Sequence, residues 1–415
     1  MKIVIFCEDY VKGGQNMFVA KLINSWPQDD EFIVVTNDSN IGIDLIKKKL
    51  HKSCTIIKHE FNFQYRMRTK VGNHIMRFIM VYGRYLILYK QLQLIRKLFK
   101  EIAPDMVLVS NGGYPGGLTC RAAALTGLYD EKWGKPIMIF HNTPVKPRVW
   151  EWYLEYYIDY LIEKAVSHLV TVSHNTCNSI INRPALRKSK KLKVIYNGIE
   201  EPEIIGNNSI IEELKLPQNS RIILTIGNLE KRKGHEFLIK AISHIENKKF
   251  NVHFLLAGNG NLYRKKELQK LCNSMKLSDC IHFLGFRDDI ASLVYQSEIL
   301  LVPSQEYESF GFINLEAMVQ KKPVVATEVG GIPEVVEHDV TGYICKKDNP
   351  LEFASRIIDL LNNKGTSVKF GIAGFERYKK YFTADIMAEN YIKLLDEIPR
   401  LYIVDPNVKT DFVQF

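Results

Sequence analysis

The chain has 415 residues, of which 46% are hydrophobic and 25% are charged. This length predicts two or three domains at about 150 residues each, and the composition is that of an ordinary soluble globular protein and does not indicate disorder. The net charge of +10 favours an anionic partner: a phosphorylated small molecule, a nucleic acid or an anionic membrane.

The first predicted strand begins at Lys2, which leaves no room for a secretory signal, so we expect a cytoplasmic protein. The seven cysteines are scattered and lack the spacing of metal ligands. We therefore expect reduced, mostly buried thiols.

Short β-rich runs alternate with longer segments of helical periodicity, which predicts a parallel sheet covered on both faces. In the first half these runs are 2–6, 32–36, 105–109, 136–140, 168–172 and 192–196. After a polar stretch at 198–220 the pattern restarts with 221–226, 252–257, 281–284, 299–302 and 323–326. The predicted fold class is α/β, with Rossmann-like doubly wound domains at 1–200 and 201–382 that face each other across a cleft. Ligands of such sheets bind beyond the carboxyl ends of the strands.

The C-terminal part is predicted to be helical from Pro350 to about Ile398, with breaks near Gly365 and Phe382. We expect residues 383–415 to form a helix and tail that return to the N-terminal domain.

A basic, aromatic segment runs from Phe61 to Lys100 and contains nine Lys or Arg residues but no acidic residue. Its apolar part is too short to span a bilayer, which takes about 20 residues. Arg77 and Arg84 are seven residues apart on one helical face, which favours a helix lying on an anionic inner leaflet. The alternatives are a helix packed on the sheet with a solvated basic edge and, less favoured without a recognition motif, nucleic-acid binding.

Two loops of the second domain combine glycine with charge. "GNLEKRKGHEFLIKA" places Gly227 after a strand, and Arg232 and Lys233 before a helix that opens near Gly234. Such a site suits phosphate, although an exposed basic turn is the simpler alternative.

In "EYESFGFINLE", Ser309 and Gly311 flank Phe310 where a helix is predicted to begin, so unpaired N–H groups face the cleft. Glu308 and Glu316 are eight residues apart and return to nearly the same face. Two such carboxylates can accept hydrogen bonds from sugar hydroxyls. The alternative is that both glutamates are solvated.

Together with "IYNGI", "LLAGNGN", "IHFLGFRDDI", "KPVVATEVGGIPEVV" and "TGY", these motifs resemble the retaining, nucleotide-sugar-dependent glycosyltransferases of family 4, which have the GT-B fold. The resemblance makes Glu308 and Glu316 the E-x7-E pair. It implies that Glu308 contacts the transferred sugar, Glu316 the ribose hydroxyls and Lys233 the diphosphate.

The resemblance further implies that the backbone of Phe310 and Gly311 adds N–H donors to the phosphates. Phe286 and Arg287 are similar to the family's base-binding loop. The chain departs from the family at Asn228, where an arginine usually helps to bind the diphosphate. Arg232 could replace that arginine, or it could be solvated.

In the N-terminal half, Gly13 and Gly14 follow the first strand, and adjacent glycines allow a left-handed turn and close approach of a ligand. In similar enzymes this loop touches the donor phosphate and the acceptor, whereas an ordinary βα turn is the alternative. His141 is similar to the family's histidine that reaches the donor sugar or acceptor, although a histidine at a strand end is often structural. The loop 110–117 is expected to shape the acceptor pocket, and Ser173 is expected to cap a helix.

The chain has no Asp-x-Asp pair, so we expect metal-independent transfer without a cofactor, with Lys233, the helix end near Gly311 and Arg232 stabilising the leaving group. The expected donor is a nucleotide-sugar, with UDP the commonest choice. The expected acceptor is a glycan on a polyprenyl-diphosphate carrier, as in bacterial O-antigen or capsule assembly, because such a carrier best fits the basic segment 61–100. The enzyme would meet this acceptor at the inner face of the plasma membrane. The alternatives are a nucleotide-sugar epimerase of the same fold and a non-catalytic nucleotide-binding scaffold, which Asn228 favours.

Overall fold

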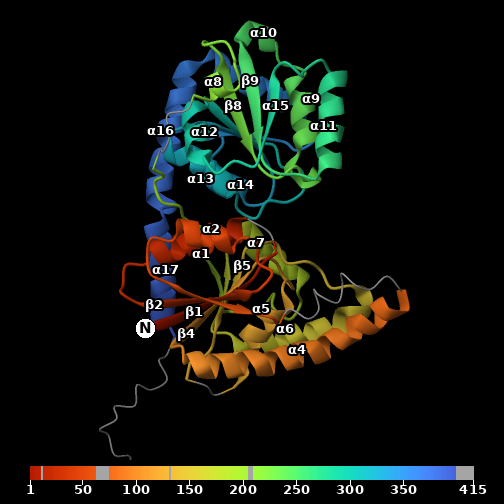
Figure 1. Cartoon of the computed structure of the whole chain (residues 1–415), viewed down its shortest axis with the longest axis vertical. Helices are drawn as coiled ribbons and strands as arrows, with labels where there is room; N and C mark the ends of the chain where they lie inside the picture. The colour runs from red at the N-terminus through yellow and green to blue at the C-terminus, as the bar shows by residue number, and fades with distance from the viewer. Residues whose placement is uncertain (11–12, 62–73, 130–131, 204–208, 399–415) are drawn as a thin grey trace, which may run out of the picture.

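The computed structural model describes residues 1–10, 13–61, 74–129, 132–203 and 209–398, except for the side chains of 74–82, Trp150 and 247–248. Two α/β domains lie one above the other (Figure 1). The N-terminal domain contains the red to yellow segments of Figure 1, and the C-terminal domain the green to blue ones, except that the last blue helix lies beside the N-terminal domain.

The N-terminal domain is built on a seven-stranded parallel sheet with the order β3-β2-β1-β4-β5-β6-β7. The order reverses between β1 and β4, as in doubly wound sheets. Its strands are β1 (Lys2–Glu8), β2 (Glu31–Asn37), β3 (Thr55–His59), β4 (Met106–Asn111), β5 (Ile137–Phe140), β6 (His168–Thr171) and β7 (Leu192–Val194). Its helices are α1 (Gly14–Asn24), α2 (Ile43–Lys49), α4 (His74–Ile102), α5 (Leu118–Leu125), α6 (Trp152–Ala165) and α7 (His174–Asn178), with the 3-10 turns η1 (Thr126–Leu128), η2 (Val149–Glu151) and η3 (Ser179–Asn182).

The C-terminal domain has a six-stranded parallel sheet with the order β10-β9-β8-β11-β12-β13. Its strands are β8 (Arg221–Ile226), β9 (Val252–Ala257), β10 (Ile281–Gly285), β11 (Ile299–Val302), β12 (Val324–Thr327) and β13 (Gly342–Cys345). Its helical elements are α8 (Ile210–Glu213), η4 (Lys231–Lys233), α9 (His235–Ile242), α10 (Asn247–Phe250), α11 (Leu262–Ser274), α12 (Ile290–Gln296), α13 (Phe312–Val319), α14 (Ile332–Val335), α15 (Pro350–Asn362) and α16 (Lys364–Tyr381). The last helix, α17 (Ala384–Asp396), returns to the N-terminal domain.

Both faces of the N-terminal sheet are buried. Val4 and Phe6 of β1 belong to one apolar cluster, and Ile3 and Ile5 to another. Because successive strand residues point to opposite faces, the continuous apolar run of β1 is the sequence expected of a central parallel strand. The predicted two-sheet α/β fold is confirmed.

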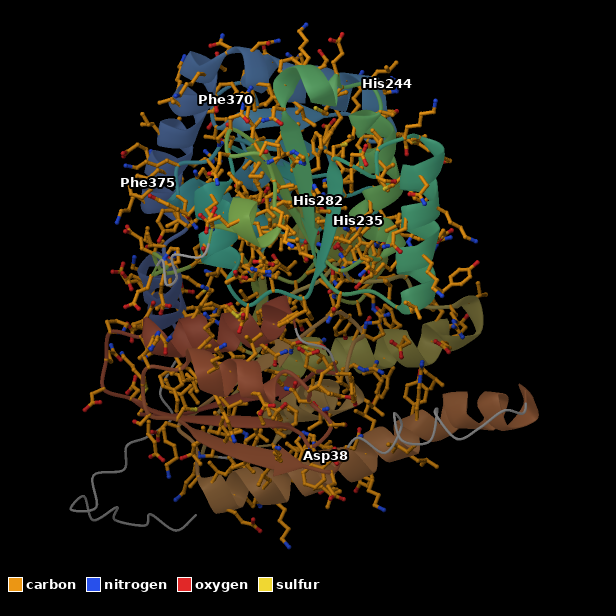
Figure 2. All side chains as sticks on the ribbon, turned by 45° about the horizontal axis from the view of Figure 1, so that its top comes forward. Asp38, His235, His244, His282, Phe370 and Phe375 are labelled. Carbon is orange, nitrogen blue, oxygen red and sulfur yellow. The ribbon has the colours of Figure 1, made fainter. Side chains whose placement is uncertain are left out.

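The chain passes between the domains at two adjacent places. The backbone N–H of Ile199 donates to the carbonyl of Phe382 at 3.0 Å, and that of Ala384 donates to the carbonyl of Ile199 at 3.0 Å. Beyond this point α17 packs on the N-terminal domain, where Tyr391 meets the ring of Phe18. Figure 2 labels Phe370 and Phe375 on the preceding helix, α16, which runs along the side of the C-terminal domain.

The breaks predicted near Gly365 and Phe382 are confirmed. The first falls at Asn363, whose side chain accepts from the N–H of Thr366 at 3.0 Å, and the second falls at Phe382 and Thr383, between α16 and α17. Across the described residues, no helix is long and apolar enough to cross a membrane.

Candidate active site

The loops after β8 and β11 bring a cation and a carboxylate together. The Lys233 ammonium donates a hydrogen bond to Oε2 of Glu308. Nη1 of Arg232 lies 3.9 Å from the same oxygen. The side chains of Lys233 and Glu308 are 19% and 13% exposed, so the pair is half-buried but open to a ligand.

The Glu308 loop is held in place by its neighbours. The Glu308 carbonyl accepts from the N–H of Gly331 at 2.8 Å, and the Arg232 carbonyl accepts from the N–H of Gln305 at 2.8 Å. Gly330 has φ +59°, and a Cβ there would lie 1.9 Å from the Glu308 carbonyl oxygen. Only glycine fits this close approach, so the 330–331 turn fixes where Glu308 projects.

Helix α13 begins beside this pair. Its N-cap, Gly311, has left-handed backbone (φ 87°) and provides no side-chain acceptor for the first N–H groups. The Phe310 side chain is 2% exposed and packs between Tyr196 and Phe382, each at a ring-centroid distance of 5.9 Å. The ring thereby anchors the start of α13, whose N–H groups and positive end suit an anion.

Glu316 lies further along α13 and is half-buried. Burial raises the pKa of its carboxyl, while Lys21 and Lys49 of the N-terminal domain act in the opposite direction. Lys21 is only 9% exposed, and burial lowers the pKa of its ammonium. Lys21 was not predicted, because only the packing of the domains brings α1 close to Glu316.

The two domains contact each other directly beside the start of α13. Oγ of Ser173 donates to the Ser309 carbonyl at 2.6 Å, and also accepts from the N–H of Thr176, which confirms Ser173 as an N-cap. The Glu334 carboxylate of α14 accepts from the N–H groups of His174 and Asn175, each at 2.7 Å. Helix α7 of one domain is thus capped by a side chain of the other.

Gly14 also lies at this junction. It is the first residue of α1, and a Cβ there would lie 3.3 Å from Cδ2 of Phe312. Gly13 has extended backbone (φ −170°), and neither Gly13 nor Gly14 has a positive φ, so the left-handed turn that adjacent glycines allow is not formed at this pair. Glycine at position 14 lets α1 approach α13 closely.

His141 follows β5 and has partners on neighbouring elements. Its Nε2 lies 2.9 Å from Oγ of Ser110, and its ring packs at 4.4 Å from the ring of Phe18. The side-chain amide of Gln15 donates to the Ser110 carbonyl at 2.7 Å. Burial lowers the pKa of His141 to about 3, so its imidazole is neutral near pH 7.

The other residues predicted to bind the donor differ in how exposed they are and in their partners. Gly227 contacts the stem of Lys233, since a Cβ there would lie 3.5 Å from its Cδ, and Asn228 is exposed. Phe286 is 53% exposed. Arg287 pairs with Glu213 and Asp289, each at 2.6 Å, which raises its pKa. Base binding by this loop stays a prediction.

The membrane-facing role predicted for Arg84 is wrong. Arg84 is 8% exposed and pairs with Glu155 at 2.8 Å and Glu151 at 3.1 Å, so it points into the N-terminal domain. A carboxylate partner on α6, distant in sequence, determines this orientation. Arg77 lies on α4, but its side chain is outside the described residues.

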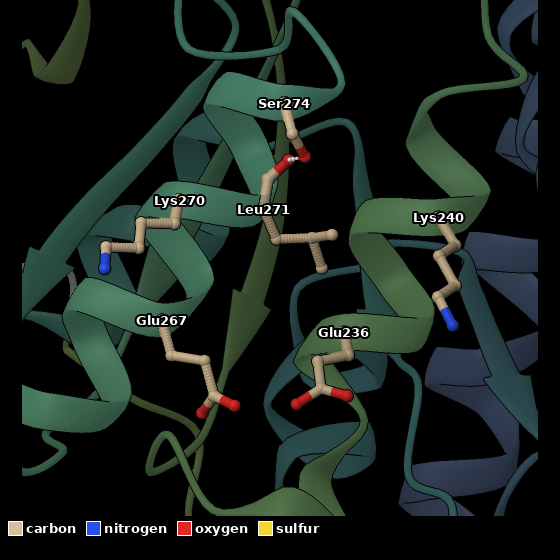
Figure 3. A pocket seen from close by; sticks show the side chains of 6 residues that line it. All are labelled: Glu236, Lys240, Glu267, Lys270, Leu271 and Ser274. Atoms are coloured by element: carbon tan, nitrogen blue, oxygen red, sulfur yellow. Dashed lines mark hydrogen bonds between the residues drawn. The ribbon is translucent and has the colours of Figure 1, made fainter.

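A hollow of about 510 Å³ lies between α9 and α11 (Figure 3). It is lined by Glu236, Lys240, Glu267, Lys270, Leu271 and Ser274. None of the predicted site residues lines it, and its mixed charges are those of a solvated helix surface.

Within the described part of the chain, no three His, Cys, Asp or Glu side chains are grouped as metal ligands would be, and metal independence stays a prediction.

Comparisons with known proteins place both halves of the chain in one group. The family model described as "Glycosyltransferase Family 4" matches residues 12–201, and that described as "Glycosyl transferases group 1" matches residues 207–377.

Curated relatives are similar over part of their length. The chain is 28% identical over 237 residues to N-acetyl-alpha-D-glucosaminyl L-malate synthase of Bacillus anthracis, covering 56% of this chain and 61% of that protein. It is 27% identical over 239 residues to the O-antigen biosynthesis glycosyltransferase WclY of Escherichia coli, covering 56% and 62%. The chain thus spans less than two thirds of the length of these relatives.

A solved structure is similar over nearly the whole chain. Anabaena Alr3699/HepE, crystallised with UDP and glucose, superposes with a TM-score of 0.74 at 19% identity, covering 96% of this chain and 100% of that one. At this level of identity the similarity is one of fold.

Proposed function

We propose that this chain, which belongs to the family 4 glycosyltransferases and has their GT-B fold, transfers a sugar from a nucleoside-diphosphate sugar to a glycan acceptor. The observation that carries the proposal is the pair formed by Lys233 and Glu308 beside the start of α13. A cation, a carboxylate and a helix N-terminus within one loop cluster are the groups that a sugar diphosphate requires.

The roles follow from charge. As the bond between the sugar and the diphosphate breaks, negative charge grows on the diphosphate, and Lys233, Arg232 and the N–H groups at the start of α13 stabilise it. Glu308 accepts hydrogen bonds from the sugar, and Glu316 from the ribose hydroxyls. The protein thereby supplies the charge stabilisation itself, so we propose transfer without a metal.

The acceptor hydroxyl must lose a proton as it attacks. A histidine whose pKa is about 3 is a weak base near pH 7, so we infer that His141 orients the donor sugar or acceptor through hydrogen bonds instead of removing this proton. The departing diphosphate, on the same face of the sugar in a retaining reaction, is the stronger base in that position.

For the finer identity of the substrates, we propose a UDP-sugar donor and a polyprenyl-diphosphate-linked glycan acceptor in bacterial surface-polysaccharide assembly. Support comes from the fold shared with Alr3699/HepE, whose structure contains UDP, and from the similarity to WclY. A lipid-carried acceptor would place the protein on the cytoplasmic face of an anionic membrane.

The proposal is tested by incubating the protein with UDP-, GDP- and ADP-sugars in EDTA and following the products by mass spectrometry. Glu308→Ala and Lys233→Ala serve as inactive variants, and Lys249→Ala, in an exposed ion pair with Glu246, as the matched control. Nucleoside diphosphate released from one sugar, and lost only in the first two variants, supports the proposal. An isomerised sugar nucleotide, or UDP binding without turnover when lipid-linked acceptors are supplied, would overturn it.

A further inference from the structure

Helix α6 (Trp152–Ala165) buries two of its acidic residues and exposes several of its aromatic side chains. Tyr153, Tyr157 and Tyr160 are 82%, 57% and 40% exposed, whereas Glu155 and Asp159 are 1% and 0% exposed. A surface helix ordinarily shows the opposite pattern. Figure 1 shows α6 beside α4 on one side of the N-terminal domain, and the ion pair between Arg84 and Glu155 joins these two helices.

The exposed residues lie along one stripe. At about 100° per residue, positions 153, 157, 160 and 164 fall within an arc of about 60°. Trp152 extends the stripe at its N-terminal end, since its ring stacks on that of Tyr156 at 5.3 Å. We call the exposed apolar and aromatic residues of this stripe the α6 tyrosine face: Val149, Tyr153, Tyr156, Tyr157 and Tyr160.

The acidic residues of α6 are directed away from this face. Glu155 pairs with Arg121 at 3.1 Å, and Asp159 pairs with Arg183 at 2.7 Å. Glu163, which is half-buried, lies 3.7 Å from Lys191. No exposed carboxylate therefore remains among the described side chains of α6.

Cations border the face. The Lys164 ammonium lies over the ring of Tyr160 at 4.6 Å, and Lys146 and Arg148, in the segment before α6, are exposed. Tyrosine combines an apolar ring with a polar end, which suits the level of lipid headgroups. Neighbouring lysine and arginine side chains are attracted to anionic lipids.

We propose that the α6 tyrosine face docks on the surface of an anionic lipid bilayer. The proposal rests on the proposed function, in which the acceptor is carried by a lipid, and it identifies the surface that meets the membrane. Only residues 142–151 separate His141 from the start of α6, so docking through this helix places the acceptor side of the enzyme near the headgroups.

Flotation with phosphatidylcholine vesicles, with and without phosphatidylglycerol, tests this surface. We expect the wild type to float with the anionic vesicles, and the triple variant Tyr153→Ser, Tyr157→Ser, Tyr160→Ser to bind them about tenfold or more weakly. Lys164→Gln, which leaves the tyrosines intact, should weaken binding to anionic vesicles about fivefold.

The matched control is Tyr263→Ser, Tyr295→Ser, which removes tyrosines that are 80% and 58% exposed on the C-terminal domain and should float like the wild type. The proposal is overturned if the wild type does not float, or if the α6 triple variant floats equally well. It is also overturned if the triple substitution abolishes self-association measured by light scattering and leaves flotation unchanged, because the face would then bind a second copy of the chain.

Donor hydrolysis in solution separates this proposal from the proposed function. The α6 triple variant should hydrolyse the donor sugar at the wild-type rate. Normal hydrolysis with unaltered flotation would contradict only the docking surface, whereas the absence of any turnover in the wild type with lipid-linked acceptors would contradict the proposed function.

Discussion

Arg183 and Asp159 form a bidentate ion pair in which Nε and Nη2 of the guanidinium each donate to a different carboxylate oxygen at 2.7 Å. Both residues are 0% exposed. Arg183 also donates to Glu155, and the hydroxyl of Tyr114, in the glycine-rich 110–117 loop, donates to Asp159 at 2.6 Å. A buried charge network therefore supports the 110–117 loop.

Removal of Arg183 should destabilise the N-terminal domain strongly. Arg183→Met leaves two buried carboxylates without one of their main partners, and breaking such a pair costs about 3–5 kcal/mol. Calorimetry should show a large fall in the free energy of unfolding of the protein. Lys249→Met, which breaks an exposed pair, should change it by less than about 1 kcal/mol. Equal effects of the two substitutions would show that the network contributes little.

Donor turnover should depend on the close approach of α1 to α13. Gly14→Val places methyl groups against Phe312, so we expect a lower rate of donor turnover with UDP affinity nearly unchanged. Phe312→Ala in the same chain should restore part of the rate, because it removes the obstructing ring. A double variant as slow as Gly14→Val alone would argue against this contact.

Arg232 should contribute more than Asn228 to diphosphate binding. Its guanidinium lies 3.9 Å from the Glu308 carboxylate and 5.0 Å from the Tyr307 ring, whereas Asn228 is exposed. By isothermal titration calorimetry, Arg232→Ala should weaken UDP binding about tenfold, and Asn228→Ala only slightly. Lys231→Ala, an exposed cation of the same turn, is the control. Equal losses for Arg232 and Lys231 would mean that only total charge matters.

Acid should destabilise the protein partly through His235, the first residue of α9 (Figure 2). Burial, followed by the nearby Arg264 and Lys233, lowers its pKa to about 4. The unfolded chain therefore binds more protons between about pH 6.5 and 4, so this contribution is present above pH 6.5 and is lost as the pH falls.

The expected loss is roughly 2 kcal/mol between pH 6.5 and 5. His235→Gln should flatten the dependence of the unfolding midpoint on pH over this range. The exposed His51→Gln is the control, and a wild-type slope in His235→Gln would contradict the assignment.

Local patterns in the sequence predicted the central strands and the start of α13, and the family resemblance implied that Lys233 and Glu308 contact one nucleotide-sugar. The edge strands β3 and β13 were missed, since the short runs Thr55–His59 and Gly342–Cys345 mix polar or small residues with apolar ones. Arg84 was assigned to the wrong face because its partner, Glu155, is 71 residues away. Ser110 and Lys21 were missed for the same reason: their neighbours come from distant parts of the chain.

The central claim is that Lys233 and Glu308 act on different parts of one nucleotide-sugar. The most direct measurement compares UDP affinity with donor turnover in Lys233→Ala and Glu308→Gln. Lys233→Ala should weaken UDP binding about tenfold or more. Glu308→Gln should bind UDP at least as tightly as the wild type, because a negative charge beside the phosphates is removed, yet lose about a hundredfold in turnover. Wild-type turnover in Glu308→Gln, or unchanged UDP affinity in Lys233→Ala, would contradict the account.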